Sequence, residues 1–598
     1  VLVQFVLDRL PPPLQFPYTV VIFLLGFALE AWSQGNGHVA RAVQKIIHIN
    51  AELILFVLVP PLLFMAGLDI NPHVLRKQIW GALWLAGPGV VLSTCLTAAS
   101  SYLAYGDWGW GWTTCFMFGA LVSATDPVAV VALLHDLGAP ESFAVLIDGE
   151  ALLNDGSASV LFFVFKDFAQ GEHKTWLQVM DQIMRLVFAS CGVGLAFAFL
   201  LIFFISATDR RPHQEIGATI AATWLCFWVA EGSGLGGSGI LATVTLSLTF
   251  TLKGTLKVSS TVLPELRHVW QHIAFCANTV LFFLCGTITF AKLREGHIAS
   301  DPAEWASLFL LYGIVHAARG ATILVSYPLL RRSTYGFDVR RAILLWWSGL
   351  RGAIGLALGL LVLDDTLFPV EVREQVMFQV AGLVTLTLLI NAPTTEGLYA
   401  FLGMNASTEG QQLTAENLYA QLDSLIEARR AALKDLPIFR DVEVSPGCCP
   451  KEGIRRALYH QPSYFARKLQ RCAWKAKKRE ATEDSVRREY WTKMLRSVAL
   501  TYKRMFHKGS LSPELYEVLN DVVETALEQP GDLSDSIAFE MGLLRKAAVR
   551  DPNACIADVP VLRKAFLMRM FEKVVLLMRL PAFVHAHTEA ALRIQNYA

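Results

Sequence analysis

The sequence has few charged residues and almost no net charge. Charged residues make up 17% of its 598 residues and hydrophobic residues 54%, while the net charge at pH 7 is +1. Soluble domains carry about 25% charged residues, so this composition excludes an ordinary soluble protein and predicts a membrane protein. Without an excess of basic residues, nucleic-acid binding is not expected.

Cysteine spacings typical of zinc sites are missing, and so is a nucleotide-binding loop. The ten cysteines are scattered, and the adjacent pair Cys448 and Cys449 is the nearest approach to a motif. Six cysteines lie in apolar segments: Cys95, Cys115, Cys191, Cys226, Cys276 and Cys285. We therefore expect buried or reduced thiols. No motif implies covalent chemistry, so we expect neither an enzyme nor a cofactor.

Long apolar segments are abundant, and each is near the roughly 20 residues that a spanning helix needs. They predict an all-α polytopic membrane protein with twelve spans. These lie near 17–32, 51–69, 78–105, 112–137, 142–168, 182–207, 215–232, 235–252, 269–291, 304–329, 341–363 and 375–400. Residues Val1 to Leu10 resemble the end of a further apolar helix, closed by three prolines. We expect this thirteenth helix to be truncated and the natural chain to begin earlier.

The loops alternate in basic content, which predicts the orientation of the spans. Basic residues on one set of loops are Arg76, Lys77, Arg210, Arg211, those within Lys253–Arg267, Arg331, Arg332, Arg340 and Arg341. That side is predicted to be cytoplasmic and receives the tail after residue 400. The other side receives Asp107, the loop 169–181 and the acidic stretch 364–374. Arg41 and Lys45 also fall there, so 41–49 is predicted to be an interfacial helix.

Two acidic motifs lie at membrane depth: Ala124-Thr-Asp-Pro127 within 112–137, and Gly149-Glu-Ala-Leu-Leu-Asn-Asp-Gly156 within 142–168. A carboxylate at that depth costs about 2.5–3.5 kcal/mol on insertion scales and marks candidate ion pathways. The pattern therefore predicts that the protein moves ions.

Segment 112–137 is not expected to be one continuous helix. Pro127 removes a backbone donor and crowds the preceding turn, and it pushes Asp126 away from helical geometry. We predict two half-helices with an unwound centre at Thr125 and Asp126, where free carbonyls and helix ends can face an ion. A simple proline kink is the alternative, but it does not account for an aspartate at membrane depth.

Glu150 and Asp155 are five residues apart, about 140° around a helix, so both cannot line one pathway. Asp155, beside Asn154 and Gly156, is the better candidate; the alternative is an aspartate paired for structure. Because Asn154 is neutral, the site has one negative charge fewer than an aspartate pair would have. One carboxylate that holds either Na⁺ or H⁺ exchanges them without net charge, provided Asp126 keeps its charge state.

Arg351 lies within the apolar segment 341–363 and requires a partner in the membrane. Glu150 is the first candidate and Glu231 the second. The glycines around Arg351 predict a loosened helix centre. Segments 112–137 and 341–363 also run in opposite directions, as an inverted repeat requires.

Four motifs in order resemble the eukaryotic Na⁺/H⁺ exchangers of the monovalent cation:proton antiporter family. They are Ala124-Thr-Asp-Pro127, Gly149-Glu-Ala-Leu-Leu-Asn-Asp-Gly156, Ser238-Gly-Ile-Leu-Ala242 and Ser348-Gly-Leu-Arg-Gly-Ala353. The resemblance covers about residues 16–400. It implies a thirteen-helix inverted-repeat fold, a homodimer and elevator-like alternating access. It also implies Asp155 as the ion-binding acid and an ion pair between Glu150 and Arg351.

Asn278 stands where the common animal exchangers have an acid. In this respect the chain is similar to the plant salt-tolerance exchangers of the plasma membrane and to the sperm-specific exchangers.

The function expected is electroneutral sodium:proton antiport by competition at Asp155. Asp155 and Asp126 are the predicted Na⁺ ligands, helped by Asn154 and Thr125. Sodium extrusion and pH or salt homeostasis are the expected roles. The alternatives are a K⁺/H⁺ antiporter, a cation channel, or a receptor or scaffold that has lost transport. We expect a multi-pass protein of the cell membrane, with an endomembrane or vacuole as the alternative.

The chain is expected to divide into a transmembrane exchanger domain, 1–402, and a cytoplasmic helical region, 403–598, for dimerisation or regulation. Helical periodicity with dense mixed charge supports the second part. Within it, the basic run 467–479 is a candidate site for anionic lipids. A solvated helix face is the alternative reading of this run.

Overall fold

The computed structural model describes residues 18–33, 37–105, 110–137, 139–171, 176–208, 211–232, 236–255, 262–295, 302–332 and 337–404, with a few isolated positions. The chain divides into two compact units, 1–493 and 494–598, and the account below concerns the first. The predicted helix at 1–10, the region 405–598 and its basic run 467–479 lie outside the described residues, isolated positions aside.

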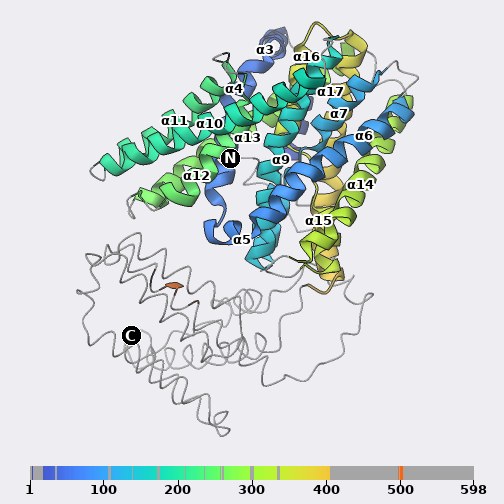
Figure 1. Cartoon of the computed structure of the whole chain (residues 1–598). Coiled ribbons are helices and arrows are strands. Elements are labelled where there is room, and N and C mark those ends of the chain that lie inside the picture. Colours follow the sequence, from blue (N-terminus) through green and yellow to red (C-terminus); the bar gives the residue numbers. More distant parts are fainter. Residues whose placement is uncertain are drawn as a thin grey trace, which may run out of the picture. The chain divides into compact units, whose positions relative to one another are not determined.

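The described residues are helical and contain no strand (Figure 1). The helices are α2 (Tyr18–Ser33), α3 (Gly37–Ile47), α4 (Ala51–Asp69), α5 (Pro72–Trp84), η2 (Leu85–Gly89), α6 (Val90–Tyr105), α7 (Trp112–Ser123), α8 (Val128–Asp136), α9 (Glu141–Ala169), α10 (Trp176–Ala207), α11 (Pro212–Gly232), α12 (Gly239–Thr249), η4 (Phe250–Gly254), α13 (Val262–Glu295), α14 (Pro302–Leu330), α15 (Val339–Trp347), α16 (Ala353–Asp364), α17 (Val370–Leu386), η6 (Thr387–Asn391) and α18 (Ala392–Phe401). The elements labelled η are π-helical turns: η2 and η6 join the helices on either side, and η4 continues the end of α12.

Each of the twelve predicted spans coincides with a helix or a run of adjoining helices. Six are long and apolar enough to cross a membrane: α4, α5–η2–α6, α10, α13, α14 and α17–η6–α18. Shorter apolar helices are α2, α7, α12–η4 and α16. The predicted polytopic helical membrane fold is confirmed. The inverted repeat stays a prediction.

Two spans are broken near their centres. Residues Ala124–Pro127 separate α7 from α8, and residues Ser348–Gly352 separate α15 from α16. The first break confirms the unwound centre predicted from Pro127, because four consecutive residues leave helical geometry rather than a single kink forming. The second break goes further than the loosening expected from glycine.

Side chains at the helix ends contact one another on both sides of the helical unit, as expected for spans that alternate in direction. On one side, Asn71 Nδ2 donates to Glu141 Oε1 over 2.8 Å, joining the starts of α5 and α9. On the other side, Lys166 forms a 2.9 Å ion pair with Asp365, which also accepts a hydrogen bond from Gln170. Burial raises the pKa of Asp365, but these hydrogen bonds, led by Lys166, outweigh it and hold that pKa below its usual value.

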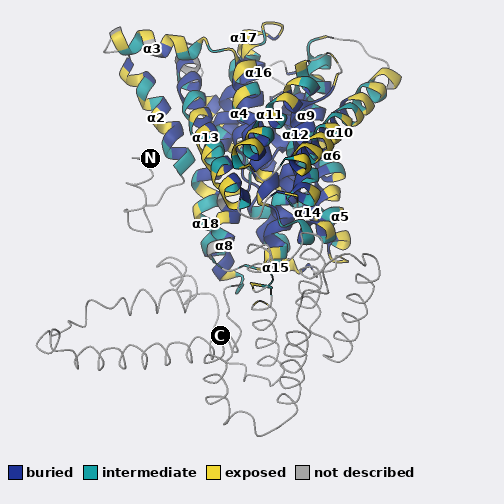
Figure 2. Cartoon of the chain, turned by 90° about the vertical axis from the view of Figure 1, so that its left-hand side faces the viewer, coloured by how far each residue is buried: buried dark blue, intermediate teal, exposed yellow. Residues whose placement is uncertain are grey.

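The centre of the helical unit is more deeply buried than its periphery (Figure 2). Helix α16 is buried along nearly its whole length, and most residues of α9 are buried. By contrast, α10 exposes large apolar side chains: Leu177, Phe188, Phe199, Leu200 and Phe203. Exposed apolar surface of this extent is expected where a helix faces lipid.

Helices α2 and α13 approach closely through two glycines. A Cβ on Gly286 would lie 2.2 Å from the carbonyl oxygen of Phe23, and one on Gly26 would lie 2.4 Å from that of Phe283. Small residues at such crossings let helix backbones pack tightly in membranes. The contact therefore depends on the absence of both side chains.

We predict that Gly286→Ala forces α2 away from α13 and destabilises the folded protein by about 1–3 kcal/mol, the usual range for overpacking. Thermal unfolding in detergent measures the effect. The matched control is Gly313→Ala in α14, where nothing lies within 4 Å of the added Cβ. An unchanged unfolding temperature for Gly286→Ala would contradict the prediction.

Candidate functional site

The two unwound segments contact each other at the middle of the helical unit. The backbone N–H of Asp126 donates to the carbonyl of Leu350 over 2.9 Å. In return, Arg351 Nη1 donates to the carbonyls of Ala124 and Ser123, at 3.1 and 3.4 Å. Backbone groups freed by one break are thus satisfied partly by residues of the other, as they must be away from water.

The Asp126 carboxylate lies at two helix N-termini. Its Oδ1 accepts a 3.1 Å hydrogen bond from the N–H of Val128, at the start of α8. The carboxylate also lies near the N–H of Ala353, at the start of α16, and interacts with it. A Cβ on Gly352 would lie only 2.0 Å from Asp126 Oδ2, so this approach requires glycine. Helix N-termini stabilise negative charge, so these two contacts favour the ionised form of Asp126 against the cost of its burial.

Arg351 places a positive charge at the C-terminal end of a helix, whereas Asp126 places a carboxylate at helix N-termini. Its guanidinium contacts the last carbonyls of α7, where the helix dipole is negative. Its backbone N–H donates to Thr387 Oγ1 of η6 over 3.2 Å. The side chain is only 4% exposed. Arg351 thus neutralises the first break and is itself fixed by the π-helical turn behind the second.

Asn154, on α9, connects that helix to the first break. Its Nδ2 donates to the carbonyl of Ser123 over 3.0 Å and to Thr125 Oγ1 over 3.1 Å. Its Oδ1 is buried without a hydrogen-bond partner among the described residues. An unsatisfied buried acceptor costs about 1–3 kcal/mol, so this oxygen is available to a cation.

Asp155 follows Asn154 and is part-buried. Its carboxylate makes no hydrogen bond to the part of the chain that the structure describes. It lies close enough to Asp126 for the two charges to interact. The structure therefore brings Thr125, Asp126, Asn154 and Asp155 together where α9 meets the first break. Their role as ion ligands stays a prediction.

The predicted ion pair between Glu150 and Arg351 is wrong. Glu150 is paired with Arg319 of α14 through two hydrogen bonds, one of them 2.9 Å from Nη2 to Oε2, and both side chains are buried. The second candidate, Glu231, instead accepts from the N–H of Gly239 over 2.6 Å, at the start of α12. As their angular separation predicted, Glu150 faces a different partner from Asp155.

Arg319 was not considered from the sequence, although its position in an apolar segment marks it as a residue that needs a partner. Arg319 is a cation within the apolar segment 304–329, and the argument applied to Arg351 applies equally to it. Arginine also matches a carboxylate in a two-bond fork, which suits a buried pair.

A second overlooked residue is Asn391, the fully buried end of η6. Its Nδ2 donates to the carbonyl of Trp347 over 3.1 Å and lies 3.3 Å from His316 Nε2. Its Oδ1 accepts from the Tyr312 hydroxyl over 2.8 Å. Asn391 therefore holds the last turn of α15 to α14, next to the second break. A polar residue in the apolar segment 375–400 was the available signal.

We predict that Glu150→Gln or Arg319→Met alone destabilises the folded protein by about 3–5 kcal/mol, because each leaves a buried charge unpaired. The double variant should lose less than the sum of the two single losses. Thermal unfolding of the four forms in detergent measures this coupling. Additive losses would show that the two charges are not paired.

The control for this cycle is the exposed ion pair between Arg185 and Asp181 on α10, with side chains 71% and 57% exposed. Exposed pairs one helical turn apart contribute only about 0.3–0.5 kcal/mol. Asp181→Asn should therefore leave the unfolding temperature nearly unchanged.

Comparison with known proteins agrees with this architecture. A family model described as sodium/hydrogen exchanger, transmembrane, matches residues 1–400. Sodium/hydrogen exchanger 7 of Arabidopsis thaliana is 30% identical over 557 residues, covering 90% of this chain and 46% of that protein. Sodium/hydrogen exchanger 8 of the same plant is 33% identical over 423 residues, covering 69% and 55%. The chain thus spans about half the length of these relatives.

The fold is also found among solved structures. The sodium proton antiporter MjNhaP1 from Methanocaldococcus jannaschii matches with a TM-score of 0.55 at 16% identity, over 66% of this chain and 94% of that one. This likeness concerns the fold. The family match covers well over half of the sequence and includes both breaks and α9. The chain belongs to the transmembrane sodium/hydrogen exchanger family, as its four sequence motifs predicted.

Proposed function

We propose that the chain is a secondary-active antiporter that exchanges Na⁺ for H⁺, and not an enzyme. The observation that carries the proposal is the environment of Asp155. This carboxylate lies on α9, one of the spans predicted from the sequence, and makes no hydrogen bond to the described residues. It lies beside the unpartnered Asn154 Oδ1 and the contact between the two breaks. The family match and the names of the relatives support the same activity.

Na⁺ binds through side-chain oxygens in this proposal. Asp155 supplies the charge, and Asn154 Oδ1, Asp126 and Thr125 supply further oxygen ligands, which hard cations prefer. Backbone carbonyls contribute less than the sequence suggested. The carbonyl of Ser123 already accepts hydrogen bonds from Asn154 and Arg351, which uses both of its lone pairs.

Asp155 is the acid that changes its charge during the cycle. In this proposal Asp126 keeps its negative charge, which the start of α8 favours, and Arg351 keeps its positive charge against the end of α7. The ionised Asp155 takes either Na⁺ or H⁺, and either one neutralises it. An empty, charged site is costly to move through the membrane interior, which enforces exchange of one ion for the other.

Alternating access involves the group of helices tied to the site. Polar contacts join α9 to the first break through Asn154, α9 to α14 through Glu150 and Arg319, and the second break to η6 through Thr387. We propose that this group moves as one body against the remaining helices. A homodimer in the cell membrane, with residues 403–598 cytoplasmic and the basic run 467–479 near anionic lipid, completes the proposal. Its role is sodium extrusion and pH or salt homeostasis.

We predict that Asp155→Asn abolishes Na⁺-driven proton flux, down to the level of protein-free liposomes, because it removes the titrating carboxylate. The measurement is an internal pH dye in liposomes that contain the purified protein. Asp167→Asn, at the far end of the same helix and hydrogen-bonded to Gln182, is the matched control and should retain exchange. Exchange at the wild-type rate in Asp155→Asn would move the ion-binding site elsewhere.

We predict that wild-type exchange is indifferent to membrane voltage, and that Asn154→Asp makes it voltage-dependent by adding a further carboxylate next to Asp155. Fluxes under Na⁺ and K⁺ gradients, with the potential clamped at different values, measure both properties. A voltage-dependent wild type would mean unequal stoichiometry or a channel. K⁺-driven flux of equal size would still support antiport but would show that the protein does not select sodium.

A further inference from the structure

A pocket of about 820 Å³ lies where α14 ends, α15 begins and the chain leaves α18. Three arginines line it: Arg331 from the end of α14, and Arg340 and Arg341 from the start of α15. Tyr327 and Val339 also line it. Because these are the ends of spanning helices, the pocket lies at the membrane–water boundary.

The pocket carries an excess of positive charge. Its one acidic residue, Asp338, accepts a 2.7 Å hydrogen bond from the N–H of Val339 and caps α15. Arg331 and Arg340 are exposed, and neither has an ion-pair or hydrogen-bond partner among the described residues. Two guanidinium groups from different helices that converge on one pocket form a site for an anion with several oxygens, such as a phosphate.

An apolar surface leads along α14 to these arginines. Leu324, Tyr327, Pro328 and Arg331 stand at positions i, i+3, i+4 and i+7 and therefore share one face of the helix. Leu324 is 75% exposed, which is expected of a side chain that faces lipid tails. Along this face the order is aliphatic, then tyrosine, then arginine. That order follows a phospholipid from acyl chain to headgroup.

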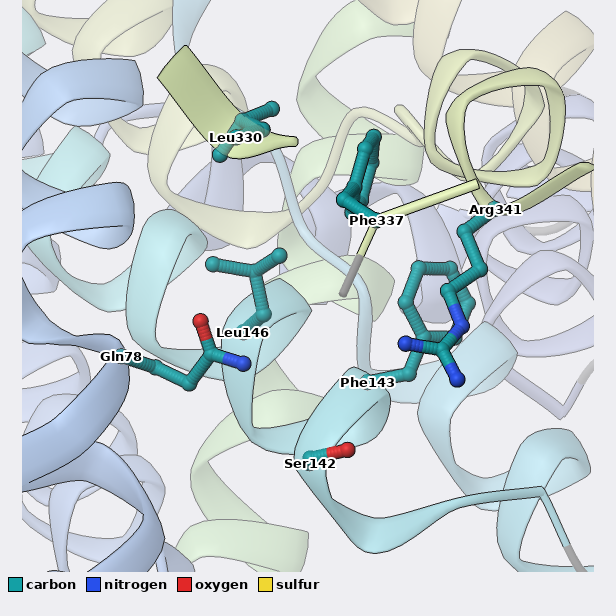
Figure 3. A pocket seen from close by; sticks show the side chains of 7 residues that line it. All are labelled: Gln78, Ser142, Phe143, Leu146, Leu330, Phe337 and Arg341. Atoms are coloured by element: carbon teal, nitrogen blue, oxygen red, sulfur yellow. The ribbon is translucent and has the colours of Figure 1, made fainter. Parts of the chain in front are cut away.

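Two other pockets are less suited to such a ligand. Phe337 and Arg341 also line a pocket of about 10 Å³, in which Arg341 reaches toward Ser142 and Phe143 at the start of α9 (Figure 3). That volume holds about one water molecule. A pocket of about 630 Å³ between α10 and α11 has a single arginine, Arg211.

We propose that the pocket between the ends of α14 and α15 binds an anionic phospholipid. Its phosphate is held by Arg331 and Arg340, and an acyl chain lies along α14 past Leu324. This site differs from the basic run 467–479, because it is built from the ends of spanning helices.

The bound headgroup would connect two elements that support the ion site. Helix α14 carries Arg319, the partner of Glu150, and α15 leads into the second break. Lipid binding at their ends would therefore favour one arrangement of these helices and raise the exchange rate. This last step rests on the proposed antiport function, whereas lipid binding itself does not.

Binding is tested by native mass spectrometry of the whole chain in detergent, with dioctanoyl phosphatidic acid as the probe. We expect Arg331→Ala or Arg340→Ala to weaken binding about fivefold and the double variant about thirtyfold, from the usual contribution of one basic residue near an anionic lipid. Arg332→Ala is the matched control, since Arg332 is exposed but does not line the pocket, and it should bind as the wild type does.

The same binding measurement with two other probes identifies the class of ligand. Dioctanoyl phosphatidylcholine and glycerol 3-phosphate should both bind at least tenfold more weakly than phosphatidic acid, because one lacks net charge and the other lacks acyl chains. Equal binding of glycerol 3-phosphate would make this a soluble-anion site and overturn the proposal. Unchanged binding in the double alanine variant would also overturn it. If that variant unfolds, Arg331→Lys with Arg340→Lys replaces it and should retain part of the affinity.

Exchange in phosphatidylcholine liposomes, with and without added phosphatidic acid, tests the functional step. The lipid should accelerate the wild type and the Arg332→Ala variant but not the double variant. If the double variant is altered equally in phosphatidylcholine alone, the arginines bind a segment of protein instead of lipid. Asp155→Asn should lose exchange yet bind phosphatidic acid normally, so failure of the antiport proposal and failure of the lipid proposal are distinguishable.

Discussion

The structure depends on one requirement: backbone groups exposed by a helix break at membrane depth must be satisfied by the protein itself. Two breaks, Ala124–Pro127 and Ser348–Gly352, meet this requirement together. Asp126 compensates the positive starts of α8 and α16, and Arg351 compensates the negative end of α7. Neither break would be stable in this form without the other, which explains why both lie at the same depth in the helical unit.

The same arrangement leaves the acidic residues near the breaks with different hydrogen-bond partners. Asp126 is fixed by helix ends and Glu150 by Arg319, so each already has a partner. Asp155 has no hydrogen bond to the described residues, and beside it the Oδ1 atom of Asn154 is buried without a partner. Among the described residues, Asp155 thus lacks partners of the kind that Asp126 and Glu150 have, and in our proposal the transported cation and the proton compete on this carboxylate.

Features that arise within one segment of chain could be predicted from the sequence, whereas the partners of side chains from different helices could not. The spans follow from hydrophobic length, and the first break follows from Pro127, because both effects act within one segment of chain. The partner of Glu150 could not be chosen from local pattern, since Arg319 and Arg351 both lie in apolar segments. The choice depends on which face of α14, and which side of the second break, turns toward α9. The hydrogen bonds of Asn391 likewise depend on how three separate elements pack.

A common principle connects the ion site with the arginine pocket at the end of α14. In the low-dielectric interior a charge without a partner is expensive, so the chain supplies partners for Glu150, Arg319, Asp126 and Arg351. At the boundary with water the cost falls, and Arg331 and Arg340 can stay without a partner in the described chain. Asp155 at depth and these arginines at the boundary are therefore open to partners from outside the chain. We propose a small cation, which must leave again, as the partner in the first case, and a component of the bilayer, which can remain, in the second.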